Sequence, residues 1–229
     1  MMPPIATQNR WSLRKEIFTY LSNQIECGAL TPGSLINVRK LTEELNVSRT
    51  PLREALAQLE IQGLVSILPQ RGVRINVLIY EDLLDLFEII GTLESQVVFT
   101  VFDQITNNKI NHMKRFNRTM EQSIDKGKNR NFHETNILFH KVFLDLSANR
   151  ELTTYVSNLK LRLFGFALKS YRDRFKRAII AEHDVLIALL REDKRQSAAD
   201  YLKEVHWKFN YPDNFIRPDA VGNSKTENN

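Results

Sequence analysis

Two short helical segments in close succession constrain the fold of this chain more than any other feature. The spacing of apolar residues predicts one helix over 38–45. Ser48 is a favourable N-cap for a second helix that runs to about Gln62, and Pro51 is tolerated in its first turn. Gly63 is placed to end that helix as the residue after the C-cap. Two helices separated by so short a break predict a helix-turn-helix.

The segments on either side of this pair complete a small domain. Apolar residues recur every four positions over 11–25 and predict an amphipathic helix, which a turn at 31–33 follows. Beyond the pair, residues 64–68 and 73–77 are β-prone and flank the turn-prone sequence PQRG. We therefore expect a hairpin here, and the N-terminal part is predicted to be a winged helix-turn-helix.

The rest of the chain differs, because helical periodicity dominates it from about residue 80 onward. The predicted helices span 81–105, 108–126, 131–147, 150–170, 173–192 and 195–210. The low contents of glycine (8) and proline (7) also argue against a turn-rich all-β fold. The expected fold class is mainly α, with an N-terminal winged helix-turn-helix and a C-terminal all-helical bundle of about six helices.

These patterns divide the chain into four segments. Residues 1–10 are predicted to be a flexible arm, and 11–78 the winged helix-turn-helix domain. Residues 80–212 form the helical domain, and the polar stretch 213–229 is expected to be disordered. The sequence shows no signal peptide and no apolar run of membrane-spanning length, and its single cysteine fits a reducing compartment. We therefore expect a cytoplasmic protein with no membrane partner.

The arginines of the N-terminal domain stand where such a domain would meet DNA. Arg49 and Arg53 are four residues apart near the start of the second helix, where a recognition helix meets base edges and phosphates. The planar guanidinium group can pair bidentately with guanine or phosphate, and Arg39 on the preceding helix can reach the DNA backbone. The net charge of +5 is too modest to decide the matter by itself.

Short donors and the hairpin tip add to this set. Ser48 and Thr50 offer hydroxyl groups to phosphate oxygens, and Arg71 and Gly72 suit a wing that enters the minor groove. The predicted DNA-binding residues are Arg39, Ser48, Arg49, Thr50, Arg53, Arg71 and Gly72. A merely solvated arginine face is the alternative, and the ordered succession of helices, turns and wing argues against it.

The helical domain contains histidines at positions that could hold a metal ion. The histidines of the chain are His112, His133, His140, His183 and His206. Asn136 and His140 share one face of a predicted helix, and His183 and His206 lie in the last two helices. Three imidazoles and one oxygen would suit zinc or nickel. From spacing alone, satisfied core or surface histidines remain the alternative.

Several stretches of the N-terminal part match a known family. They are 28–35 (GALTPGSL), Leu41, 47–56 (VSRTPLREAL), 63–65 (GLV) and 71–73 (RGV). The chain resembles the GntR family of bacterial regulators, and its match to that family's VSRTPxREAL motif is close and specific. The resemblance implies that Arg39, Arg49, Arg53 and Gly72 occupy positions that contact operator DNA.

A second resemblance extends over the C-terminal part, so that about residues 12–210 are covered. The matching stretches are Phe139-His140, 147–152 (SANREL), Glu182-His183 and His206. They are similar to the FCD sensor domain, named for the fatty-acid regulator FadR, of one GntR subfamily. Its metal-binding members use an Asp or Asn four residues before the first His, plus three His. The resemblance therefore implies a metal site formed by Asn136, His140, His183 and His206, with His112 and His133 outside it.

This chain departs from the family's pattern at two positions. Asn136 stands where Asp is commoner, and a neutral amide is a weaker ligand than a carboxylate. Ile90 stands four residues before Glu94, where the family often has an arginine that holds an effector carboxylate. Cations that could replace that arginine are Lys160, Arg162 and Lys169, for which a solvated position is the alternative.

The apolar character of the predicted helix 81–105 suggests burial on several sides, in a dimer interface or in the core of one subunit. The resemblance to a dimeric family implies a homodimer.

We expect a repressor whose affinity for double-stranded operator DNA is controlled by a small-molecule effector, an organic acid being the candidate, near a bound divalent metal. The alternatives are a constitutive DNA-binding dimer and a metal-dependent enzyme. No His-Glu-x-x-His motif supports the enzyme.

Overall fold

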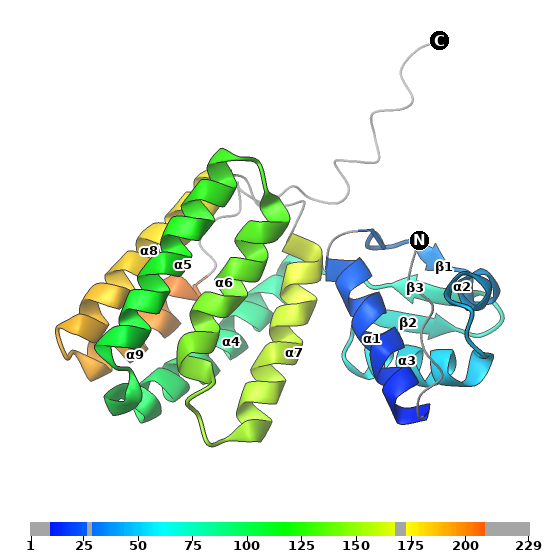
Figure 1. Cartoon of the computed structure of the whole chain (residues 1–229), viewed down its shortest axis with the longest axis horizontal. Helices are drawn as coiled ribbons and strands as arrows, with labels where there is room; N and C mark the ends of the chain where they lie inside the picture. Colours follow the sequence, from blue (N-terminus) through cyan, green and yellow to red (C-terminus); the bar gives the residue numbers. More distant parts are fainter. Residues whose placement is uncertain (1–9, 27–28, 168–172, 209–229) are drawn as a thin grey trace, which may run out of the picture. The chain divides into compact units, whose positions relative to one another are not determined.

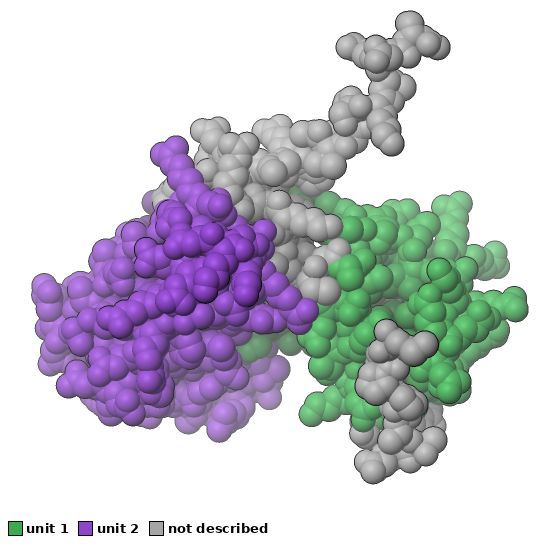
Figure 2. All heavy atoms as spheres, turned by 45° about the horizontal axis from the view of Figure 1, so that its top comes forward, with its two compact units in different colours: residues 1–79, 157–166 green, residues 80–156, 167–229 purple. Residues whose placement is uncertain are grey.

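The computed structural model describes residues 10–26, 29–167 and 173–208, and the chain divides into two compact units. Unit 1 comprises residues 1–79 with 157–166, and unit 2 comprises 80–156 with 167–229 (Figure 2). The predicted disordered tail and all but the last residue of the predicted arm lie outside the described residues.

The helices of unit 1 are α1 (Arg10–Glu26), α2 (Val38–Leu45) and α3 (Arg49–Ile61). The break between α2 and α3 is closed by Asn46, which adopts a left-handed conformation with φ 51° as the C-cap of α2. Ser48 is the N-cap of α3 as predicted, although its side chain makes no capping hydrogen bond. Gly63 follows the C-cap of α3 with φ +72°, a conformation that glycine adopts without strain. The predicted helix-turn-helix is therefore present.

A three-stranded antiparallel sheet forms the wing. Its strands are β1 (Leu35–Ile36), β2 (Val65–Leu68) and β3 (Gly72–Ile75), in the order β1-β3-β2. β2 and β3 are the predicted hairpin, whereas β1 was not predicted. A Cβ at Gly72, whose φ is +105°, would lie 2.7 Å from the carbonyl oxygen of Ile36. Glycine is thus required for β1 to pair with the wing hairpin.

The core of unit 1 is built from the inward faces of these elements. Fully buried side chains from α1 and α3 meet the sheet, among them Ile17, Leu21, Leu52, Leu56 and Val73. The segment 157–166, part of α7 (Arg150–Ala167), also belongs to this unit. Its Leu161 packs against the same core, and Gln62 Nε2 donates a hydrogen bond to Asn158 Oδ1 at 3.1 Å. Unit 1 therefore includes a piece of a helix that the sequence assigns to the other domain.

Unit 2 is a bundle of antiparallel helices (Figure 1). Besides α7, its elements are α4 (Tyr80–Val101), a 3-10 turn η1 (Phe102–Gln104), α5 (Asn107–Asp125), α6 (Asn129–Leu144), α8 (Asp173–Arg191), α9 (Arg195–Tyr201) and a π-helical turn η2 (Leu202–His206). α5 packs against both α6 and α8, and α4 packs against α9. The predicted fold class is confirmed. Within the described residues, no helix is long and apolar enough to cross a membrane.

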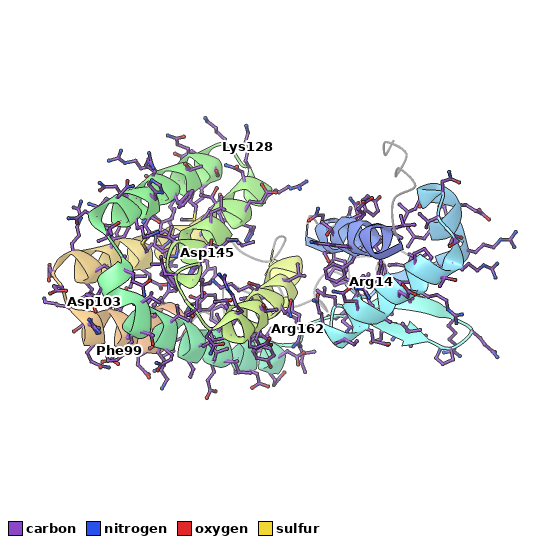
Figure 3. The ribbon with its side chains drawn as sticks, turned by 60° about the horizontal axis from the view of Figure 1, so that its bottom comes forward. Arg14, Phe99, Asp103, Lys128, Asp145 and Arg162 are labelled. Carbon is purple, nitrogen blue, oxygen red and sulfur yellow. The ribbon has the colours of Figure 1, made fainter. Side chains whose placement is uncertain are left out.

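Three predicted helices of unit 2 end several residues earlier than expected, and the one predicted to reach residue 147 ends at Leu144. The helix predicted to reach residue 105 ends at Val101 and continues as η1, whose Asp103 accepts a hydrogen bond from Arg195 Nη2 at 2.5 Å. The same guanidinium lies 5.4 Å from the ring centre of Phe102, so both contacts hold η1 against the start of α9. Asp103 is labelled in Figure 3. The helix predicted to reach 210 ends at Tyr201, because the chain widens into η2.

Gly91 of α4 sets how closely the end of η2 approaches the bundle. A Cβ at this position would lie 2.6 Å from the Cβ of Trp207, which follows η2 directly. No side chain fits at that distance without a shift, so the glycine allows η2 to lie against α4. Trp207 is buried there, with its ring edge-on to Phe87 at a centroid distance of 5.4 Å.

Candidate DNA-binding groove and metal centre

Arginines from both helices of the helix-turn-helix line one groove of unit 1. Arg39 of α2 and Arg49 and Arg53 of α3 form part of a groove of about 640 Å³, and the wing contributes Gln70 and Gly72 to its lining. All three arginines are exposed. Arg39 Nε donates to Glu43 Oε1 at 3.3 Å, but an ion pair this exposed is weak and can be exchanged for a phosphate. The groove therefore presents three guanidinium groups to an anion.

The other predicted DNA-binding residues are exposed but do not line this groove. Ser48 and Thr50 lie at the N-terminus of α3, where the backbone N–H groups and the helix dipole favour phosphate. Arg71 lies at the tip of the wing. Gln70 was not predicted as a site residue, although it stood within the turn sequence PQRG.

Three predicted histidines come together inside unit 2. His140 of α6, His183 of α8 and His206 of η2 are all buried, and their ligand atoms lie within 4.8 Å of one another. The Nε2 atoms of His140 and His206 are 3.4 Å apart. The bundle thus places residues separated by up to 66 positions around one point.

Each of these rings is held at its other nitrogen by an oxygen acceptor. The pairs are His140 Nδ1 with Glu94 Oε2 at 2.7 Å, His183 Nδ1 with Asn117 Oδ1 at 3.0 Å, and His206 Nδ1 with Glu182 Oε2 at 2.9 Å. An ionised carboxylate or an amide oxygen can only accept, so each Nδ1 carries the proton and donates it. In the neutral ring the Nε2 atom then has a lone pair and no proton. Three such lone pairs directed at one point suit a cation.

The acceptors are themselves fixed in place. Asn117 Nδ2 donates to Asp184 Oδ1 at 2.8 Å, which orients the amide so that its oxygen meets His183. Glu94 is fully buried on α4, and its Oε2 atom also accepts a hydrogen bond from Trp207 Nε1 at 2.8 Å. Outer partners of this kind set the tautomer and orientation of metal-binding histidines.

Asn136 lies one turn before His140 on the same face of α6. It is buried, and its Oδ1 atom has no hydrogen-bond partner in the described part of the chain. A buried amide oxygen without a partner is destabilising, and a cation bound beside it would satisfy it. The donor set of three imidazole nitrogens and one oxygen fits a divalent metal.

The other two histidines lie outside this cluster. His112 is half-buried on α5. His133 is buried on α6, and burial, followed by the nearby charge of Lys176, lowers the pKa of His133 from 6.5 to about 3. Lys176 is itself buried, and its Nζ atom donates to Asn129 and Asp173. His133 is therefore neutral in the folded protein at neutral pH.

We predict that His133 makes the fold sensitive to acid. Its pKa is about 3 when folded and 6.5 when unfolded, so the unfolded chain binds one more proton between these values. The contribution of neutral His133 to the free energy of unfolding is fully present above pH 6.5. It falls as the pH drops toward 3, by up to about 1.4 kcal/mol per pH unit. Replacing His133 with Gln should flatten the pH dependence of unfolding by urea in this window. A His112→Gln control should not, and equal slopes in parent and His133→Gln protein would contradict the prediction.

Two of the three candidate effector residues, Lys160 and Arg162, belong to the segment of α7 that forms part of unit 1. Lys160 is buried on α7, whereas Arg162 is half-buried and lines a small pocket of unit 1 with Gly63 and Asn76. Lys169 lies outside the described residues. Ile90, which stands where the resemblance predicts arginine, is fully buried on α4.

A winged helix-turn-helix with an arginine-lined groove, joined to a helical unit with a buried histidine cluster, defines a DNA-binding regulator that carries a sensor domain. The model of the bacterial regulatory proteins of the gntR family matches residues 13–75, and that of the FCD domain matches residues 85–206. The chain therefore belongs to the GntR family, in the group with a C-terminal FCD domain. It is a transcriptional regulator under effector control and not an enzyme.

Known relatives agree with this assignment. The Nta operon transcriptional regulator of Aminobacter aminovorans is 30% identical over 75% of this chain and 80% of its own length. The HTH-type transcriptional regulator YdhC of Bacillus subtilis is 24% identical over 82% of this chain and 84% of its own length. The solved structure of Escherichia coli McbR/YncC has the same fold, with a TM-score of 0.73 at 22% identity, and covers 85% of this chain and 93% of its own.

Proposed function

We propose that this protein is a homodimeric repressor that binds a two-fold operator and releases it when an acidic effector binds beside a divalent metal in unit 2. The observation that carries the proposal is the convergence of three imidazole Nε2 atoms within the FCD domain. Repression fits such a molecule because an operator-bound dimer excludes other proteins from the DNA that it covers. No additional contact surface is needed for that effect.

The lining of the groove in unit 1 supports different roles for its residues in DNA binding. Arg49 and Arg53 point from the recognition helix into the groove and would meet guanine edges and phosphates in the major groove. Arg39 would hold the backbone that passes between helix and wing, and Ser48 and Thr50 would donate to phosphates at the N-terminus of α3. The wing would place Arg71 and Gly72 against the minor groove.

The metal would be held by Asn136, His140, His183 and His206. Zinc and nickel are the metals that suit nitrogen-rich sites of this kind. When bound, such an ion acts as a Lewis acid that can take oxygen ligands from an effector carboxylate. Glu94 and Glu182 orient their imidazoles and bring acidic groups close to a site whose fourth ligand, Asn136, is neutral.

The positive charge of a bound divalent metal complements a carboxylate, which supports an organic acid as the effector. The residue that the family often uses for the acid is Ile90 here, so a second anchor must come from elsewhere. Lys160 and Arg162 both lie on the part of α7 that belongs to unit 1, and Lys169 lies outside the described residues, so all three remain candidates on the ground of the sequence. Arg162 lines a small pocket of unit 1 with Gly63 and Asn76.

Apolar residues that remain exposed on α4 support the homodimer. Leu84, Ile89 and Phe99 are each more than a third exposed, although α4 is otherwise a core helix of unit 2 (Figure 3 labels Phe99). A two-fold contact through α4 would bury them. Two DNA-binding units related by that axis would then recognise an inverted repeat.

A selection experiment tests the proposed function. Metal-loaded protein should enrich an inverted repeat from a library of random DNA duplexes. Chelating dicarboxylic or hydroxy acids, titrated against that duplex in a fluorescence anisotropy assay, should include one that lowers the affinity about 5- to 150-fold, the usual range of allosteric coupling. An enriched duplex that no acid releases would support the constitutive dimer instead, and a duplex without two-fold symmetry would contradict the dimer.

A further inference from the structure

The tip of the wing contains an unusual residue for its backbone conformation. Arg71 N–H donates to the carbonyl oxygen of Leu68 at 3.1 Å, which closes a four-residue turn with Pro69 and Gln70 at its centre. Gln70 has a φ of +59°. A positive φ at the third residue is what a type II turn requires, and Gly or Asn usually occupies that position.

Glutamine is a costly choice there. Its Cβ crowds the backbone in the left-handed region, and its side chain cannot form the short local hydrogen bonds that make Asn and Asp tolerable. The side chain is exposed, so burial in the core does not compensate. A residue kept in a strained conformation on a binding surface suggests that its side chain has a use.

The position of Gln70 indicates what that use is. It lines the groove that Arg39, Arg49 and Arg53 also line. Those three residues are permanent cations, whereas Gln70 is a neutral group with an amide that can donate and accept. A cation binds phosphates of any sequence, but a neutral amide gains most where it meets the edge of a base.

We propose that Gln70 determines operator specificity by donating a hydrogen bond to an A·T base pair in the minor groove, beside the bases that α3 contacts. This inference rests on the proposed operator binding. In the minor groove an A·T pair presents only acceptors, adenine N3 and thymine O2, whereas G·C adds the amino group of guanine. Arg71, exposed next to Gln70, favours the narrow minor groove of A·T sequences because its negative potential is greater.

The test compares the full-length protein with Gln70→Ala, Gln70→Gly and Gln70→Asn variants. Each protein is first used to enrich sequences from a random duplex library, and affinities are then measured for duplexes that differ at one base pair. Gln122→Ala is the matched control, because Gln122 is an exposed glutamine on α5 in unit 2. Gly and Asn both suit a positive φ, so these variants remove or shorten the side chain while they relieve the strain.

The parent should prefer A·T over G·C by about 5- to 100-fold at one position of each half-site, the range expected for one good base contact. That preference should disappear in the Ala and Gly variants and weaken in the Asn variant. The preferences at the other positions should stay, and the Tm of Gln70→Gly should match or exceed that of the parent.

Two results would overturn the inference. Equal weakening at every position would mean that Gln70 only shapes the wing or contacts phosphate, and an unchanged profile would mean that its side chain is not used. A parent protein that enriches no sequence would overturn the proposed operator binding itself, which is a different outcome from the loss of one position.

Discussion

Replacing both Arg49 and Arg53 with alanine should abolish operator binding and leave the fold of the protein intact. Each residue is exposed and faces the groove that we assign to DNA, so its loss removes a base or phosphate contact and no core packing. A bidentate arginine contact contributes about 1–3 kcal/mol, so each single variant should bind about 5- to 150-fold more weakly. The two losses together should bring the complex below detection in a gel shift with the enriched duplex.

Arg118→Ala is the matched control for this prediction. Arg118 is also an exposed arginine near the middle of a helix, but it lies on α5 in unit 2. It should bind the operator as the parent does, which separates a local contact from an effect of net charge. Circular dichroism should show unchanged helix content in all variants, because exposed substitutions alter stability by about 0.5 kcal/mol or less. Normal gel-shift affinity in both single arginine variants would refute the assignment of the groove.

The second large effect concerns metal. Elemental analysis of untagged protein, purified without chelator, should find one zinc or nickel ion per chain and almost none in His140→Ala. Because the metal binds only the folded protein, a free concentration 100 times the Kd stabilises the fold by about 2.7 kcal/mol. A chelator should therefore lower the Tm of the parent and leave that of His140→Ala unchanged.

Two further variants separate loss of metal from damage to the core. His140 is fully buried, and its removal opens a cavity, whereas His206 is 8% exposed, so His206→Gln disturbs the packing less. It should also lose the metal. His112→Ala removes a histidine from outside the cluster and should keep it. Equal metal content in the parent and in both cluster variants would refute the site.

Local sequence signals sufficed for most of the fold. The helix-turn-helix could be located because its breaks rest on residues with clear backbone preferences, and Gly63 ends α3 as predicted. β1 could not be predicted, because a strand of two residues shows no alternation of apolar and polar positions. The π-helical turn η2 could not be predicted for a similar reason, since one extra residue in a single turn does not disturb the apolar spacing of a whole helix.

The histidines of the candidate site could be found in the sequence, but most of the groups that orient them could not. Asn117 of α5 contacts His183 of α8 and donates to Asp184 of the same helix, and nothing in the sequence spacing connects Asn117 with these two residues. Glu182 holds His206, although the sequence places it beside His183. Such pairings depend on how helices are rotated against each other, and a single sequence does not specify that rotation.

The close approach of Gly91 and Trp207 also limits how this sensor can be re-engineered. The Cβ atoms of the two positions would collide at 2.6 Å if residue 91 were anything larger than glycine. Trp207 is at the same time the indole that donates to Glu94, and Glu94 steadies His140. A library that diversifies either position alone would mostly return inactive sensors. Positions 91 and 207 must be randomised as a pair. Relatives with a residue larger than glycine at position 91 are expected to have a residue smaller than tryptophan at position 207.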